Sequence, residues 1–75
     1  MKIKLSRHAK RRAKLYNIST SAIMDILTSM SLDQGKQEII RDIVELQYPL
    51  KIVVSVEKDI ATVITNYPLK KGKKR

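Results

Sequence analysis

The clearest pattern of apolar and polar positions lies in residues 48–69 and predicts two β-strands joined by a tight turn. Apolar side chains occupy every second position from Leu50 to Val56, and β-branched residues dominate residues 60–65. Alternation with a period of two, rich in Val, Ile and Thr, is typical of strands. Lys58 and Asp59, between the two runs, are the expected two-residue turn. The pair lacks the glycine that such a turn prefers, so the alternative is a longer loop with a shifted register.

A two-residue turn fixes the pairing of these strands. Counting outward from it, the expected partners are Glu57 and Ile60, Val54 and Val63, Ile52 and Thr65, and Leu50 and Tyr67. This register predicts that Thr65 and Tyr67 lie at the open end of the apolar sheet face.

Two helices are expected before the hairpin. Ser6 stands where an N-cap belongs, and Ala9, Ala13 and Tyr16 share one face of a helix over residues 7–16. Asn17 suits the left-handed backbone that ends a helix. A second helix then begins at Ser19 or Thr20 as N-cap, with apolar residues at helical spacing: Ala22, Ile23, Ile26, Leu27 and Met30.

The other segments are less regular. Residues 1–5 alternate Lys with apolar side chains and predict a short edge strand, and residues 31–36 predict a loop. Residues 38–46 fit a helix or a strand, and their β-branched content favours a strand without deciding. The chain therefore predicts an α+β fold: a short N-terminal strand, two helices, then a two- to three-stranded antiparallel β-meander with the helices on one sheet face. Residues 1–69 are expected to form one domain, and residues 70–75 a mobile basic tail.

The net charge is +9, and its distribution matters more than its sum. Residues 1–16 hold seven Lys and Arg residues and no acid, residues 70–75 hold five, and the stretch between carries −3. Such asymmetry predicts a polyanionic partner, above all nucleic acid, although solubility or an acidic protein partner would also account for it. The expected nucleic-acid contacts are basic side chains: Lys10, Arg11, Lys14, Arg41, Lys70, Lys71, Lys73 and Lys74.

Composition narrows the chemistry. The chain has no Cys and one His, and its acids are scattered, so neither a metal nor a small-molecule cofactor is expected. Gly35 and Gly72 are the only glycines, which excludes a phosphate-binding glycine loop. No segment approaches the roughly 20 apolar residues of a membrane span, and no signal peptide is apparent, so a cytoplasmic location is expected.

His8 and Arg12 lie one helical turn apart and are the best candidates for chemistry. An imidazole can transfer a proton near neutral pH, and a guanidinium can hold two phosphate oxygens. RNA supplies its own 2′-hydroxyl nucleophile, so such a pair could cleave a phosphodiester without a metal. The alternative is that His8 is a helix-border residue and Arg12 a solvated cation.

Three further side chains have two interpretations each. Tyr67 could stack on a base or hydrogen-bond to phosphate, with Thr65 beside it, or both could be ordinary strand residues. Arg41 could join the phosphate site or pair with an acid, Glu57 or Asp42.

Three short motifs resemble one known family. Residues 8–12, HAKRR, match an H-A-x-x-R start, and Ile18-Ser19 follows at the spacing of an R-G-I-S corner in which Tyr16-Asn17 replaces Arg-Gly. The stretch ATVITNYPLKKGKK resembles a V-I-T-x-Y strand followed by basic residues. Together they resemble a family of small uncharacterised domains grouped with the RelE-like toxins, in the barnase–EndoU–colicin–RelE class of metal-independent ribonucleases.

The resemblance implies a strand–helix–helix–sheet fold, metal-independent endoribonuclease activity on RNA, and an acidic antitoxin protein as partner. Its site residues, carried over by position, would be His8, Arg12, Thr65 and Tyr67. The alternative is a non-catalytic module of the same fold that binds nucleic acid or a protein.

Overall fold

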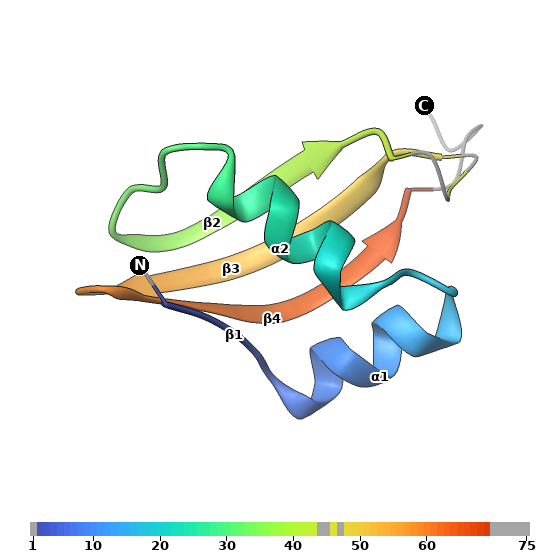
Figure 1. Cartoon of the computed structure of the whole chain (residues 1–75), viewed down its shortest axis with the longest axis horizontal. Coiled ribbons are helices and arrows are strands. Elements are labelled where there is room, and N and C mark those ends of the chain that lie inside the picture. The colour runs from blue at the N-terminus through green and yellow to red at the C-terminus, as the bar shows by residue number, and fades with distance from the viewer. Residues whose placement is uncertain (1, 44–45, 47, 70–75) are drawn as a thin grey trace.

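The computed structural model describes residues 2–43, 46 and 48–69 and has two helices and a four-stranded mixed sheet (Figure 1). In chain order the elements are β1 (Lys2–Leu5), α1 (Arg7–Leu15), α2 (Thr20–Thr28), β2 (Gly35–Arg41), β3 (Leu50–Glu57) and β4 (Ile60–Pro68). The strands are ordered β1-β4-β3-β2. The α+β class is confirmed. The predicted antiparallel sheet of two or three strands is in fact a four-stranded mixed sheet, in which β2, β3 and β4 are antiparallel and β1 pairs with β4 in parallel.

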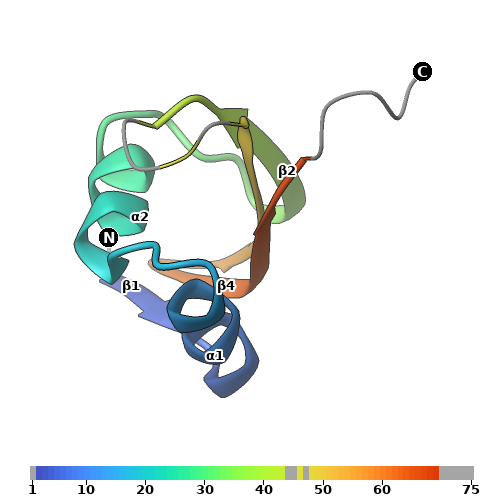
Figure 2. The ribbon, with the colours of Figure 1, turned by 90° about the vertical axis from the view of Figure 1, so that its right-hand side faces the viewer.

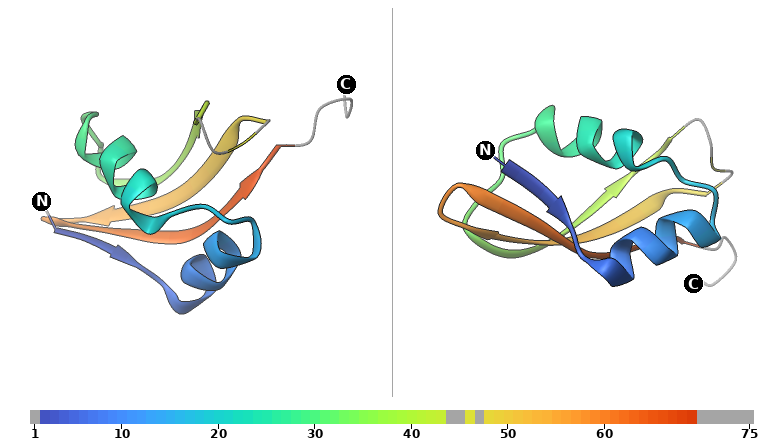
Figure 3. Two further views of the ribbon diagram at one scale, coloured as in Figure 1. Left: turned by 45° about the vertical axis from the view of Figure 1, so that its right-hand side comes forward. Right: turned by 60° about the horizontal axis from the view of Figure 1, so that its bottom comes forward.

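The sheet curves around α2, and the core lies between them (Figure 2). β3 supplies every second residue from Leu50 to Val56 to this core, and Ile23 and Leu27 of α2 meet them one helical turn apart. α1 lies alongside the C-terminal half of β4, beyond the end of β1 (Figure 3). The sheet side that faces α2 is the inner face, and the opposite side, which neither helix covers, is the outer face.

The predicted N-cap Ser6 is confirmed, and of the two candidates for the second helix Ser19 is the N-cap. The hydroxyl of Ser6 accepts a hydrogen bond from the Ala9 N–H at 3.0 Å, and that of Ser19 accepts one from the Ala22 N–H at 3.1 Å. Each bond satisfies one of the N–H groups that the first turn of a helix leaves unpaired. Asn17, with φ 58°, supplies the predicted left-handed residue between the helices.

Residues 38–46 contribute to a strand rather than a helix. β2 begins at Gly35, inside the segment predicted as a loop, and ends at Arg41, because residues 35–41 pair with residues 50–56 of β3. The pairing satisfies the backbone of β2 along one edge and suits the β-branched Ile39 and Ile40. The rest of the ambiguous segment is not in a helix or strand where it is described, and residues 44–45 lie outside the described residues.

The turn between β3 and β4 is the predicted two-residue turn. Glu57 pairs with Ile60, and Lys58 takes a left-handed φ of 57° without being glycine. The side chain of Gln34 stabilises this conformation, because it accepts from the Lys58 N–H at 2.8 Å and donates to the Lys58 carbonyl at 3.0 Å. A distant amide therefore provides what the local sequence lacks.

The predicted register holds from the turn to Val63 and then fails. Ile64 has no partner, and beyond this β-bulge the pairs are Val53 and Thr65, Ile52 and Asn66, and Lys51 and Tyr67. The predicted pairs of Ile52 with Thr65 and of Leu50 with Tyr67 are therefore wrong. One extra residue in a strand moves every later side chain to the opposite face.

α1 holds this bulge in place. The Ser6 hydroxyl, besides capping α1, donates to the Ile64 carbonyl at 2.9 Å, and the Asn66 side chain donates to the Ala9 carbonyl at 3.1 Å. Asn66 is thereby fully buried on the inner face, and Thr65 turns to the outer face.

Neither helix of the described chain is long and apolar enough to cross a membrane.

Candidate nucleic-acid interface

α1 is built to lie close to β4 with one face and to present charge with the others. Ala9 and Ala13 are buried, and their small side chains let the helix backbone approach β4 closely enough to accept the Asn66 hydrogen bond. The exposed side chains of α1 are Arg7, His8, Lys10, Arg11, Lys14 and Leu15, and Arg12 is half-buried.

The charge on α1 is unbalanced. The helix carries five Lys and Arg residues and no acid, and no acid stands in its first turn. Within the described part of the chain, the one ion pair joins Lys51 to Glu38, on β3 and β2. The cations of α1 are therefore held at the surface without an acidic partner among the described residues.

His8 and Arg12 lie together, as the helical spacing predicts. They line one surface hollow, whose other lining residues are Arg11, Lys14 and Leu15. Leu15 is 66% exposed, so the hollow combines cations with one apolar side chain. Such a surface can hold phosphate oxygens through the guanidinium groups and contact a sugar or base through Leu15.

Thr65 and Tyr67 are not part of this group. The bulge turns both toward the outer face, where Tyr67 is paired with Lys51. The Lys51 ammonium lies 5.9 Å from the Tyr67 ring centroid and 2.9 Å from a Glu38 carboxylate oxygen. The hydrogen bond with Glu38 raises the pKa of Lys51 above its ordinary value of 10.5. The four predicted site residues are thus split into two pairs, His8–Arg12 on α1 and Thr65–Tyr67 on the outer face.

The other predicted contacts also separate. Lys10, Arg11 and Lys14 are on α1 as expected, whereas Arg41 ends β2 and places its guanidinium 3.9 Å from the Met30 sulfur, just after α2. The tail candidates Lys70, Lys71, Lys73 and Lys74 lie outside the described residues.

Two residues of this region were not predicted. Arg7 adds an exposed cation to the first turn of α1, and its position directly after the Ser6 cap could have indicated it. Asn66 anchors β4 to α1, but nothing in its neighbouring sequence distinguishes it from an outward-facing strand residue.

Comparison of the chain with protein-family models, with curated proteins and with solved structures gives no match. The RelE-like resemblance rests on the short motifs quoted above.

Proposed function

We propose that the protein binds RNA, with the cations of α1 holding the phosphate backbone. The observation that carries this proposal is the exposure on one nine-residue helix of four Lys and Arg residues, with a fifth half-buried and no acid. Phosphate contacts by Lys and Arg supply most of the affinity in sequence-independent nucleic-acid binding.

Arg12 and Lys14 suit the last turn of the helix, where the dipole favours a cation, but the other charges are unfavourable for α1. Arg7 and Arg11, and likewise Lys10 and Lys14, are like charges at i, i+4, and each such pair costs a helix about 0.2–0.5 kcal/mol. Arg7 also stands at the N-terminal end, where the helix dipole disfavours a cation. A bound polyanion would remove both penalties, which supports a role for these charges outside the fold.

A salt titration of binding tests the proposal. Wild type is expected to bind a single-stranded RNA with an affinity that falls steeply as salt rises. The variant Lys10→Ala/Lys14→Ala should lower the slope of log K against log salt by about 1.4, because two phosphate contacts are lost. The matched control, Lys4→Ala/Lys36→Ala, removes the same charge from β1 and β2 and should keep the wild-type slope.

Two results would contradict the proposal. One is the absence of RNA binding at low salt, which would favour an acidic protein partner. The other is an equal loss of slope in both double variants, which would mean that net charge, rather than α1, governs binding.

Metal-independent RNA cleavage is the second candidate, and the shared hollow of His8 and Arg12 favours it. In this reaction the 2′-hydroxyl would attack the phosphorus and the bond to the 5′-oxygen would break. His8 would take the proton of the 2′-hydroxyl and return it to the leaving 5′-oxygen, and Arg12 would stabilise the charge on the phosphorane. The expected product is a 2′,3′-cyclic phosphate formed in EDTA. His8→Ala should lower the rate at least about 100-fold.

Tyr67→Phe provides the matched variant for the cleavage assay. If His8 and Arg12 act without residues of the outer face, this variant should cleave at the wild-type rate, whereas an equal loss in both variants would restore the four-residue site. If wild type leaves RNA intact, or if His8→Ala cleaves at the wild-type rate, the cleavage function is ruled out and RNA binding remains the proposed function.

A further inference from the structure

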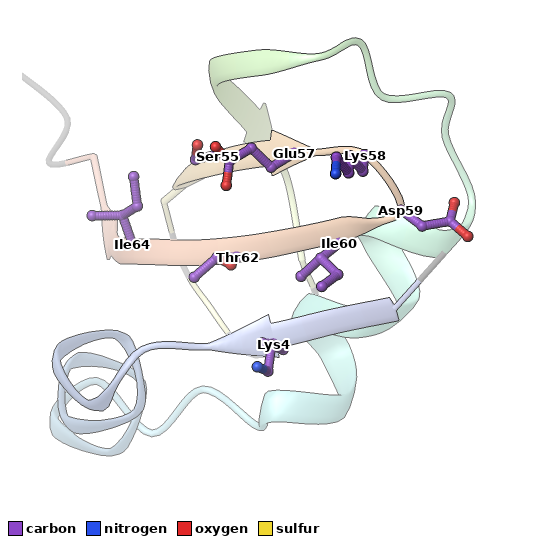
Figure 4. A pocket seen from close by; sticks show the side chains of 8 residues that line it. All are labelled: Lys4, Ser55, Glu57, Lys58, Asp59, Ile60, Thr62 and Ile64. Atoms are coloured by element: carbon purple, nitrogen blue, oxygen red, sulfur yellow. The ribbon is translucent and has the colours of Figure 1, made fainter.

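The outer face of the sheet carries a hollow that the proposed RNA contact does not use. Its floor is β4, and Ile60 and Ile64 are 39% and 37% exposed there. Figure 4 shows the side chains that line it: Lys4, Ser55, Glu57, Lys58, Asp59, Ile60, Thr62 and Ile64. Together the two isoleucines form an apolar centre on a sheet face that no helix covers, and this is what a partner can bury.

The charge of this hollow differs from that of α1. It contains two lysines, Lys4 and Lys58, and two carboxylates, Glu57 and Asp59, so its formal charge is zero. A polyanion would gain little attraction here. The complementary partner is a surface that also carries both signs around an apolar centre, and a second copy of the same face meets that description.

The strand register shows how two copies would match. In one row across the sheet, Lys2 of β1 and Glu57 of β3 stand on either side of Ile60 of β4. A two-fold axis parallel to β4 at Ile60 exchanges these two sides. It therefore places Lys2 over Glu57 of the partner subunit and Ile60 over Ile60 of the partner subunit. A two-fold axis across the strands would instead place Lys2 over Lys2 of the partner subunit.

We propose that the outer face is the interface of a symmetric homodimer, packed sheet to sheet about an axis parallel to β4. The contact is isologous, with Ile60 at its centre and two Lys2–Glu57 pairs flanking it. Sheets pack about 10 Å apart, a gap that Ile side chains fill and that extended Lys and Glu side chains bridge.

Charge reversal tests this geometry. Sedimentation equilibrium should show wild type in a monomer–dimer equilibrium. Lys2→Glu and Glu57→Lys should each weaken association at least about tenfold, because each turns two attractions into two repulsions. The double variant Lys2→Glu/Glu57→Lys has the wild-type net charge and exchanged signs, and it should restore association to within about threefold of wild type.

Two further variants separate the contact from the general effect of an added charge. Ile60→Lys puts two ammonium groups at the axis and should leave only monomer. Met24→Lys adds the same charge at an apolar position of α2 that is also 39% exposed and lies away from the outer face, and it should dimerise like wild type. Far-ultraviolet circular dichroism of each variant checks that it is folded.

The proposal fails if wild type is monomeric at about 0.5 mM, because a dimer with a micromolar Kd would be almost completely formed at that concentration. It also fails if the single variants associate like wild type, or if the double variant is as weak as the singles. These outcomes are independent of the RNA proposal, because Lys10→Ala/Lys14→Ala should dimerise normally whether or not it binds RNA.

Discussion

The two halves of β4, before and after Ile64, are held in different ways. Residues 60–63 lie between β1 and β3 and pair with both strands. Their alternation is regular, with Ala61 and Val63 fully buried. Residues 65–68 pair with β3 on one side and have α1 rather than a strand on the other. Where a strand is hydrogen-bonded to a neighbour on both sides, the alternation of its residues determines which side chains are buried. Where a helix replaces one of these neighbours, contacts with the helix determine which side chains are buried.

The C-terminal half shows the strength of those contacts. A regular register would have buried Thr65 and Tyr67 and exposed Asn66. The bulge instead buries Asn66 and leaves Thr65 and Tyr67 partly exposed, although no described residue donates a hydrogen bond to the Asn66 side-chain oxygen. The hydrogen bonds from Asn66 to the Ala9 carbonyl and from Ser6 to the Ile64 carbonyl hold this arrangement in place of the regular register.

The largest effect is expected from Asn66→Asp, which breaks the contact between β4 and α1. The variant has nearly the same shape, loses the donor to the Ala9 carbonyl and places a carboxylate in a fully buried site. At neutral pH the free energy of unfolding should fall by about 3 kcal/mol or more. Urea unfolding at several pH values measures this loss.

The pH dependence of Asn66→Asp has a definite sign. Burial raises the folded-state pKa of a carboxyl above its unfolded value of about 3.9, so the penalty should be small at low pH and should grow as the pH rises. Asn66→Ala loses the same hydrogen bond but introduces no titratable group, so its decrease in the free energy of unfolding should not depend on pH in this way. An equal loss for Asn66→Asp at about pH 4 and pH 7 would mean that water reaches the site.

Ser6→Ala should have the next largest effect, about 2 kcal/mol, because it removes both the cap of α1 and the donor to the Ile64 carbonyl. Ser19→Ala is the matched variant, since it removes the cap of α2 and a side-chain bond to Ser21 but no contact with the sheet. It should lose about 1 kcal/mol. Equal losses in urea unfolding would show that the bond to Ile64 contributes nothing to stability.

Deletion of Ile64 should lower the free energy of unfolding by less, about 1 kcal/mol. The residue has no partner in β3, so its removal makes the ladder continuous and keeps every pair that the structure has beyond it. Hydrogen exchange should show that the backbone amide of Asn66 is still protected from solvent in the deletion variant. Loss of protection at Asn66 would instead mean that the bulge itself is needed to bring β4 to α1.

The smallest effect is expected from Glu38→Gln. Glu38 of β2 pairs with Lys51, which lies over Tyr67 in the C-terminal half of β4 on the outer face. The folded-state pKa of Lys51 is raised by its hydrogen bond with Glu38, so this stabilisation is present below the unfolded pKa of 10.5 and is lost as the pH rises through the folded value. The difference between the urea midpoints of wild type and Glu38→Gln should therefore narrow from about pH 9 to about pH 12. If this difference does not change with pH, the effect of Glu38→Gln on stability comes from packing rather than from the charge pair.

Short-range patterns predicted much of the fold. The caps Ser6 and Ser19 and the buried face of Ala9 and Ala13 depend on residues within a few positions of one another. The turn at Lys58 was placed by the two strands on either side of it, but its left-handed conformation is also held by Gln34, 24 positions away. The start of β2 at Gly35 was not predictable in this way, because pairing with β3 brings together residues about 20 positions apart along the chain.

The candidate site also contains a part that was predictable from nearby residues and a part that was not. His8 and Arg12 were expected together because both are on one helix, and one helical turn separates them in any fold that keeps that helix. Thr65 and Tyr67 were expected beside them because of an uninterrupted register, and one unpaired residue, Ile64, moved both to the other face.

By itself, the sequence determined the helices, the hairpin turn and the concentration of positive charge at the two ends of the chain, because capping, periodicity and charge are local properties. Only the tertiary structure decided which face the end of β4 presents. The hydrogen bonds that hold the bulge join Ser6 to Ile64 and Ala9 to Asn66, over 57 or 58 positions of the chain. Because these bonds exist only after α1 has packed beside β4, no pattern within β4 could have indicated them.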